Sequence, residues 1–269
     1  MKIVLTLLLT SLLLLSFSSR AACTASSVTT SFGSLSSFTL ASAAQSVQSS
    51  TRLSCVSDAL LSLLSSYTIT AKITLSSSAS GTTPRMYSSA VSSYVPYSIC
   101  GDASCSTTYT PGTTYSWTAT SLATLLSLFS SSNTTMPIYL VTPTGSNVPA
   151  GTYTDTFTIT WTYTTCSSSL LCLSLTTTTA TTTATVTVNM IVTNDCTINS
   201  APDVDFGSAA LPADFASVSS SLSVTCTKNA SYSVDLTSIS SSSGKWRQMV
   251  ASGTSGTSYL QYQLYQADG

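Results

Sequence analysis

The sequence predicts an all-β protein made of two antiparallel β-sandwich domains. Short runs in which apolar and polar residues alternate recur along the chain, β-branched Thr and Val are abundant, and spacers rich in Ser, Gly and Pro separate the runs. In the clearest run, residues 151–163, large apolar side chains alternate with threonines, a period of two that is typical of a strand with one buried face. These large side chains are Tyr153, Phe157, Ile159, Trp161 and Tyr163.

The composition favours a folded protein that is not an enzyme. Of the 269 residues, 43% are hydrophobic and 6% are charged, and a mean hydropathy of +0.33 is too high for a disordered tail. The chain has no His and its nine acids are all Asp, so a serine nucleophile would have only a lysine as its base. A net charge of −1 with scattered cations gives no basic stripe for phosphates. We therefore expect no catalysis, no cofactor and no nucleic-acid partner.

Residues 1–22 have the layout of a secretory signal peptide. Lys2 precedes an apolar run over residues 3–15, which is too short to span a bilayer, and Ala21 and Ala22 supply small residues for the cut. A lipoprotein with an acylated Cys23 is the alternative, but Arg20 stands where a lipoprotein signal has Leu. The mature chain is expected to begin at Ala22 or Cys23.

All eight cysteines follow that cut, and an even number in an exported chain indicates disulfides. No pair has the C-x-x-C spacing and no His is present, so we expect no metal. The cysteines are Cys23, Cys55, Cys100, Cys105, Cys166, Cys172, Cys196 and Cys226.

An internal repeat divides the mature chain into residues 23–192 and 193–269. In each copy a Phe-Gly pair and then a second Cys follow the first Cys: Phe32-Gly33 and Cys55 after Cys23, and Phe206-Gly207 and Cys226 after Cys196. The matching registers suggest Cys23–Cys55 and Cys196–Cys226 as equivalent bridges, which leaves Cys100–Cys105 and Cys166–Cys172 as local links. The second copy has no counterpart of residues 151–163, so we expect it to be truncated.

These features resemble the spore coat protein U domain, the subunit module of archaic, Csu-type chaperone–usher pili. The resemblance is carried by Cys-(x)8–9-Phe-Gly, the second Cys, an Arg-(x)-Met pattern at Arg85-Met86 and Arg247-Gln248-Met249, a Tyr-rich strand, and the closing GTYTDTFTITWTY. It implies an immunoglobulin-like sandwich that lacks its last strand and receives one from the next subunit. The implied partners are a periplasmic pilus chaperone, an outer-membrane usher and the next pilin subunit.

Residues 174–192 are predicted to complete the first domain in cis. Val186, Val188, Met190 and Val192 alternate on one face just before the second copy. The first domain has no segment ahead of Cys23 to donate, which predicts a two-domain tip subunit at the end of a fibre. The alternative is a Thr-rich linker, because residues 174–192 include the tract TTTTATTTA.

Three Leu-rich stretches of the first domain are candidates for surface binding. As exposed loops they would bury apolar area against a surface; as short amphipathic helices over 58–66 and 121–132 they would instead cover the ends of the sandwich. Aromatic residues at 94, 97, 109, 115 and 117 could form a sugar-binding shelf or could simply pack on strand faces. The surface candidates are Leu60, Leu61, Leu63, Leu64, Leu122, Leu125, Leu126, Phe129, Leu170 and Leu171.

Together these features predict a protein exported through the periplasm to the cell surface. Its expected function is that of a pilus tip adhesin that attaches to an apolar or host surface and supports biofilm formation. The alternatives are a capping pilin without an adhesive role and a Ser/Thr-rich coat protein that does not polymerise.

Overall fold

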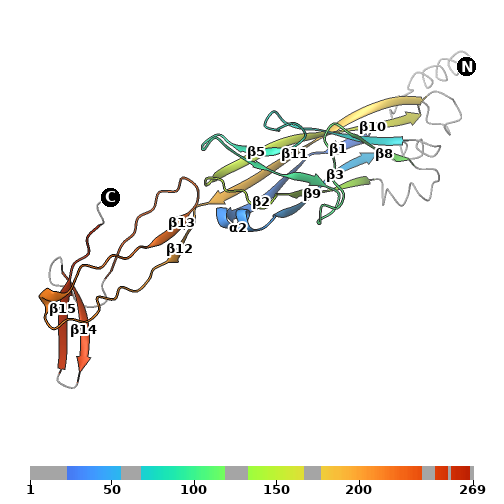
Figure 1. Ribbon diagram of the computed structural model, residues 1–269. Helices are drawn as coiled ribbons and strands as arrows, with labels where there is room; N and C mark the ends of the chain where they lie inside the picture. Colours follow the sequence, from blue (N-terminus) through green and yellow to red (C-terminus); the bar gives the residue numbers. More distant parts are fainter. Residues whose placement is uncertain are drawn as a thin grey trace, which may run out of the picture. The chain divides into compact units, whose positions relative to one another are not determined.

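The computed structural model describes residues 23–55, 68–118, 133–166, 177–237, 246–253 and 256–266 (Figure 1). The chain divides into two units, Met1–Asp195 and Cys196–Gly269. Strands dominate the first unit. Among the described residues, no helix is long and apolar enough to cross a membrane.

The first unit is a β-sandwich of a four-stranded and a seven-stranded sheet. The smaller sheet has the order β1 (Cys23–Ser26), β3 (Ser46–Cys55), β9 (Asn133–Val141) and β7 (Ser98–Cys100). The larger sheet has the order β2 (Val28–Ser36), β11 (Thr177–Thr193), β10 (Gly151–Cys166), β4 (Thr68–Thr74) and β8 (Thr114–Thr118). A hairpin made of β5 (Arg85–Ser88) and β6 (Ser93–Pro96) joins the larger sheet through β10.

The core lies between the two sheets and contains side chains from both. Period-two alternation explains why: on β10 the odd-numbered large residues point inward, and Trp161 and Phe157 are buried there. Leu53 of β3 and Ile138 of β9 belong to the same cluster from the opposite sheet. A short helix, α2 (Ser37–Ser42), follows β2; the Ser36 side chain caps it by accepting a hydrogen bond from the Thr39 amide at 3.1 Å.

One strand pair departs from the antiparallel arrangement that the sequence predicts. β11 runs parallel to β2, while the other described pairs are antiparallel. The chain passes from the smaller sheet to the larger one at Ser27, between β1 and β2. Residues 37–176 separate β2 from β11 in the sequence. Because no tight turn connects the two strands, they are not required to run in opposite directions.

The second unit contains two two-stranded sheets. One pairs β12 (Cys196–Ser200) with β13 (Ser223–Cys226), and the other pairs β14 (Arg247–Gly253) with β15 (Gly256–Tyr262). A single 3-10 turn, η1 (Pro212–Asp214), lies between β12 and β13 in the described part of this unit. Cys196 lies opposite Cys226 in register, as Cys23 lies opposite Cys55 in the first unit.

The Phe-Gly positions of the two copies share one backbone conformation. Gly33 and Gly207 have φ angles of 78° and 74°, in the left-handed region that glycine adopts without strain. In each copy the glycine amide donates to the side chain two residues earlier: to Ser31 Oγ at 3.0 Å and to Asp205 Oδ1 at 2.8 Å. The repeat is therefore structural as well as sequential.

Candidate functional site

β11 lies in the larger sheet between β2 and β10 (Figure 1). It pairs with β10 along the whole length of that strand, from Gly151↔Val192 to Cys166↔Thr177, and with β2 over residues 186–193. Both edges of β11 are therefore hydrogen-bonded over its C-terminal part, residues 186–192.

The inward face of β11 is apolar and buried. Val186, Val188 and Met190 are fully buried and Val192 is 2% exposed, whereas Ile191 on the outward face is 48% exposed. The four inward side chains belong to the same core cluster as Phe157 of β10. Full burial of such a side chain contributes about 1.5–3 kcal/mol relative to exposure. The strand is therefore held both by its backbone and by its apolar face.

A buried carboxylate lies opposite this strand. Asp155 of β10 is 5% exposed and pairs with Val188 of β11. Its carboxylate accepts hydrogen bonds from Tyr97 Oη at 2.7 Å, Ser78 Oγ at 2.9 Å, the Thr156 amide at 2.8 Å and Ser76 Oγ. These donors come from the segment after β4, the β6–β7 connection and β10 itself. The carboxylate thus ties three parts of the sandwich together.

Burial and the Asp155 carboxylate raise the pKa of Tyr97 well above the usual tyrosine value of about 10. The phenol therefore stays protonated in the folded protein at pH values where it ionises in the unfolded chain.

We predict an alkaline loss of stability from this tyrosine. Its contribution is fully present below about pH 10 and falls as the pH rises further, by about 1.4 kcal/mol per pH unit, because only the unfolded state releases the proton. Urea unfolding between pH 9 and 11 measures the slope, and Tyr97→Phe should make it shallower. Burial also raises the pKa of Tyr153, so part of the slope should remain in that variant. An unchanged slope would contradict the prediction.

The first residue of β1 is anchored to β10. The Cys23 amide donates to Tyr163 Oη at 3.1 Å, and the same hydroxyl donates to the Cys23 carbonyl at 3.2 Å. Cys23 is 5% exposed and is disulfide-bonded. The chain is thus fixed in the sandwich from the residue where the mature protein is expected to start.

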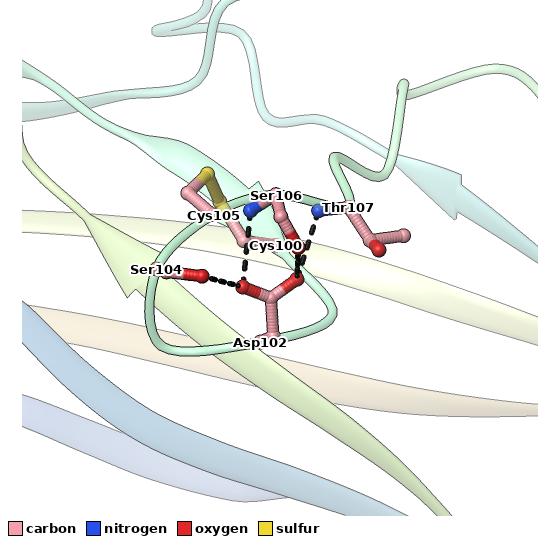
Figure 2. The surroundings of a disulfide bond; sticks show 6 residues. All are labelled: Cys100, Asp102, Ser104, Cys105, Ser106 and Thr107. Atoms are coloured by element: carbon pink, nitrogen blue, oxygen red, sulfur yellow. Dashed lines mark hydrogen bonds between the residues drawn. A yellow bond between two sulfur atoms is a disulfide. The ribbon is translucent and has the colours of Figure 1, made fainter.

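A local disulfide loop lies between β7 and β8 (Figure 2). Within the Cys100–Cys105 loop, Asp102 accepts hydrogen bonds from Ser104 Oγ at 2.6 Å, Ser106 Oγ at 2.7 Å and the Ser106 and Thr107 amides at 3.0 and 2.8 Å. These hydrogen bonds hold the pKa of the carboxyl well below its usual range. The loop is closed both by its disulfide and by its own aspartate.

The disulfides Cys100–Cys105 and Cys196–Cys226 are the pairs that the sequence predicts. The Cys166–Cys172 pairing stays a prediction, because residues 167–176 lie outside the described part of the chain. All ten surface-binding candidates, Leu60, Leu61, Leu63, Leu64, Leu122, Leu125, Leu126, Phe129, Leu170 and Leu171, also lie outside the described residues.

The aromatic residues of the candidate sugar shelf do not form one surface. Tyr97 is buried in the core, and Tyr109 pairs edge-to-face with Tyr115 at 5.0 Å. Tyr94 is 40% exposed and lies beside Tyr87, which the sequence pattern alone does not indicate as a neighbour. The β5–β6 register places these two tyrosines opposite each other, and only the strand pairing could have identified that neighbour.

Apolar side chains of the second unit are exposed, in contrast with the first. Among its described residues, Thr227 at 3% is buried, while large apolar side chains are mostly open to solvent. The most exposed, each above half of its area, are Ile198, Leu211, Tyr232, Leu236, Tyr259 and Tyr265. A surface of this kind marks an interaction site or an incomplete core.

Comparison with known proteins places this arrangement in a family. None of the curated proteins compared with the chain matches it significantly. Among solved structures, the chain is similar to the CsuC-CsuE chaperone-tip adhesion subunit pre-assembly complex from archaic chaperone-usher Csu pili of Acinetobacter baumannii, with 20% identity and a TM-score of 0.46 over 78% of this chain and 72% of that one. It is also similar to CfaE, the adhesive subunit of CFA/I fimbria of enterotoxigenic Escherichia coli, with 14% identity and a TM-score of 0.39 over 65% and 49%.

A third similar structure is AggA, the major subunit of aggregative adherence fimbriae type I from Escherichia coli, with 10% identity and a TM-score of 0.34 over 65% of this chain and 95% of that one. The sequence model of the Spore Coat Protein U domain matches residues 9–160 and 182–269, which is most of the chain. The protein therefore belongs to the Spore Coat Protein U domain family.

Proposed function

We propose that this chain is the tip subunit of a chaperone–usher pilus, with residues 174–192 completing its first unit. In this assembly mode a subunit that lacks a strand receives one from its neighbour. The first unit needs no such donor, because its own β11 occupies the position of the missing strand between β2 and β10. The second unit accepts a strand from the next pilin, and the pair of units ends the fibre.

The single observation that supports the proposal most strongly is the position of β11 in the larger sheet, between β2 and β10. If β11 were removed, β10 would lose a partner along its full length, and the core around Phe157 would lose Val186, Val188 and Met190. Such a sheet would present unpaired amides beside an apolar opening, which is an unstable and sticky surface.

The second unit has exposed apolar side chains that a donated strand could cover. Its exposed apolar residues include Val234 at 48% and Val250 at 46%. An added strand with alternating apolar residues would cover such side chains and pair with a free strand edge. A periplasmic pilus chaperone and an outer-membrane usher would have to shield the same surface before assembly, so we propose both as partners.

Tip location follows from what the first unit can donate. β1 begins at Cys23, whose amide and carbonyl are bound to Tyr163, so no strand precedes it in a chain that starts there. A subunit that accepts but does not donate ends a fibre. The N-terminal residue of the mature protein, identified by mass spectrometry, tests this point. An N-terminus at residue 22 or 23 agrees with it, and one that leaves a free alternating segment before Cys23 would contradict it.

A labelling experiment tests the place in the fibre directly. Gold-labelled antibody against the first unit should mark one end of each fibre. Marks spaced along the shaft would contradict the tip assignment. Failure of the chain to co-purify with a periplasmic chaperone would favour the coat protein that does not polymerise.

Adhesion is tested by changing Leu60, Leu61, Leu170 and Leu171 to Ser. Normal fibres that no longer attach to apolar surfaces or form biofilm support the adhesin. Normal fibres that attach as before would leave only the capping role.

A further inference from the structure

The outward face of the β5–β6 hairpin carries two tyrosines and an arginine. The register pairs Tyr87 with Tyr94 and Arg85 with Pro96, so these four residues share one face. The alternate residues Met86 and Val95 are fully buried in the core. The buried side chains of Met86 and Val95 therefore hold the hairpin against the core, and this fixes the geometry of its outward face.

The aromatic rings and the guanidinium are in contact. The centroids of Tyr87 and Tyr94 are 4.6 Å apart with their planes tilted by 33°, and Cζ of Arg85 lies 4.2 Å from the centroid of Tyr94. Tyr94 nevertheless keeps 40% of its area exposed. Tyrosines offer rigid amphipathic area with little side-chain entropy to lose on binding.

Backbone carbonyls hold Arg85 in place. Its Nε donates to the Ser78 carbonyl at 2.8 Å and its Nη2 to the Ala79 carbonyl at 3.4 Å. Among the described residues, no carboxylate forms an ion pair with this guanidinium, and the Asp155 carboxylate is directed to Ser78 and other neutral donors instead. The Nη1 end of the guanidinium keeps its donors available for a ligand.

We propose that this face binds a carboxylated saccharide of the uronate class. A sugar ring has an apolar C–H face that matches an exposed tyrosine, and hydroxyl and carboxylate groups at its rim. A lone arginine beside that ring matches one carboxylate, because the planar guanidinium binds carboxylates through paired N–H groups. One cation beside two tyrosines in contact suits one uronate unit of a short chain, whereas a nucleic acid would need several cations along its phosphates.

The experiment uses the full chain and two probes that differ only in charge, trigalacturonate and its methyl ester. By calorimetry we expect the acid to bind with a Kd of about 1 mM, as is typical of an open, flat site. The ester should bind at least fivefold more weakly, and added salt should weaken the acid but not the ester. Equal affinity for the two probes, or no binding of the acid, would overturn the proposal.

Variants identify the residues. Tyr94→Ala should weaken acid binding about tenfold, whereas Tyr94→Phe keeps the ring and should bind as the parent does. Arg85→Lys should reduce the preference for the acid over the ester. The repeat supplies matched controls in the second unit, Tyr259→Ala and Arg247→Lys, which should leave binding unchanged.

Two further outcomes decide the ligand class and the place of the site. Tighter binding of oligouridylate than of trigalacturonate would overturn the uronate assignment. Loss of binding in Tyr259→Ala with normal binding in Tyr94→Ala would contradict the site. Because this binding assay does not require fibre assembly, failure here leaves the proposed tip role intact, and failure of the tip role leaves this site intact.

Discussion

Val186→Asp is expected to unfold the first unit, whereas Ile191→Asp in the same strand is expected to leave it folded. Val186 is fully buried opposite Phe157, and a carboxylate there has no cation to pair with among the described residues. We expect a loss of more than about 4 kcal/mol, which is most of the stability of an ordinary domain. Ile191 faces outward and is 48% exposed, so its carboxylate stays in water.

Urea unfolding followed by tryptophan fluorescence measures this difference, because Trp161 is buried in the core of the first unit. The two substitutions introduce the same charge into the same strand at similar aliphatic residues. Equal stability of the two variants would mean that β11 does not belong to this core.

The second large effect is expected at Asp155. Asp155→Ala leaves the buried Tyr97 Oη without its acceptor inside the sandwich and removes the partly buried hydrogen bonds from Ser78 Oγ and the Thr156 amide. A buried donor without a partner costs about 1–3 kcal/mol, and a hydrogen bond to a charged group contributes about 1.5–3 kcal/mol, so we expect a total loss of about 3–5 kcal/mol. Asp155→Asn should cost less, because an amide oxygen still accepts hydrogen bonds.

Asp102 provides the matched control for this prediction. It also accepts four hydrogen bonds, two of them from Ser106, but it does so in a solvent-accessible disulfide loop (Figure 2). Water replaces the lost acceptor there, so Asp102→Ala should change the unfolding midpoint far less than Asp155→Ala. A larger effect at Asp102 than at Asp155 would show that burial of the carboxylate is not what matters.

Much of the fold could be predicted from alternation and repetition alone. Residues 151–163 and 184–192 alternate because each forms a strand with one face in the core, and they pair with each other in the larger sheet. The repeat predicts the Cys196–Cys226 bridge because it aligns Cys226 with Cys55. These features depend on local pattern, which a single sequence records directly.

Other features depend on contacts between distant segments and could not be predicted in the same way. Asp155 occupies an inward position of its strand, between Tyr153 and Phe157, and that position was the available signal of a buried carboxylate. Its partner Tyr97 is 58 residues away and could not be identified by spacing. The parallel pairing of β11 with β2 is likewise set by tertiary packing and not by either strand's own sequence.

The two units differ in the way that the proposed assembly requires. In the first, the inward residues of β11 are buried, and both edges of the strand are paired over residues 186–192. In the described part of the second, the strands form separate pairs, and residues such as Tyr259 and Ile198 remain exposed. In the proposed assembly the first unit completes itself and the second accepts a strand, which is the condition for ending a fibre.

Hydrogen exchange of the β11 amides in the monomeric chain tests the central claim most directly. If residues 184–192 complete the first unit in cis, the amides of residues 186–192 should exchange as slowly as those of β10, and their protection should not change when the protein is diluted. Rapid exchange of these amides, or protection that disappears on dilution, would show that the segment is free or is held by another molecule.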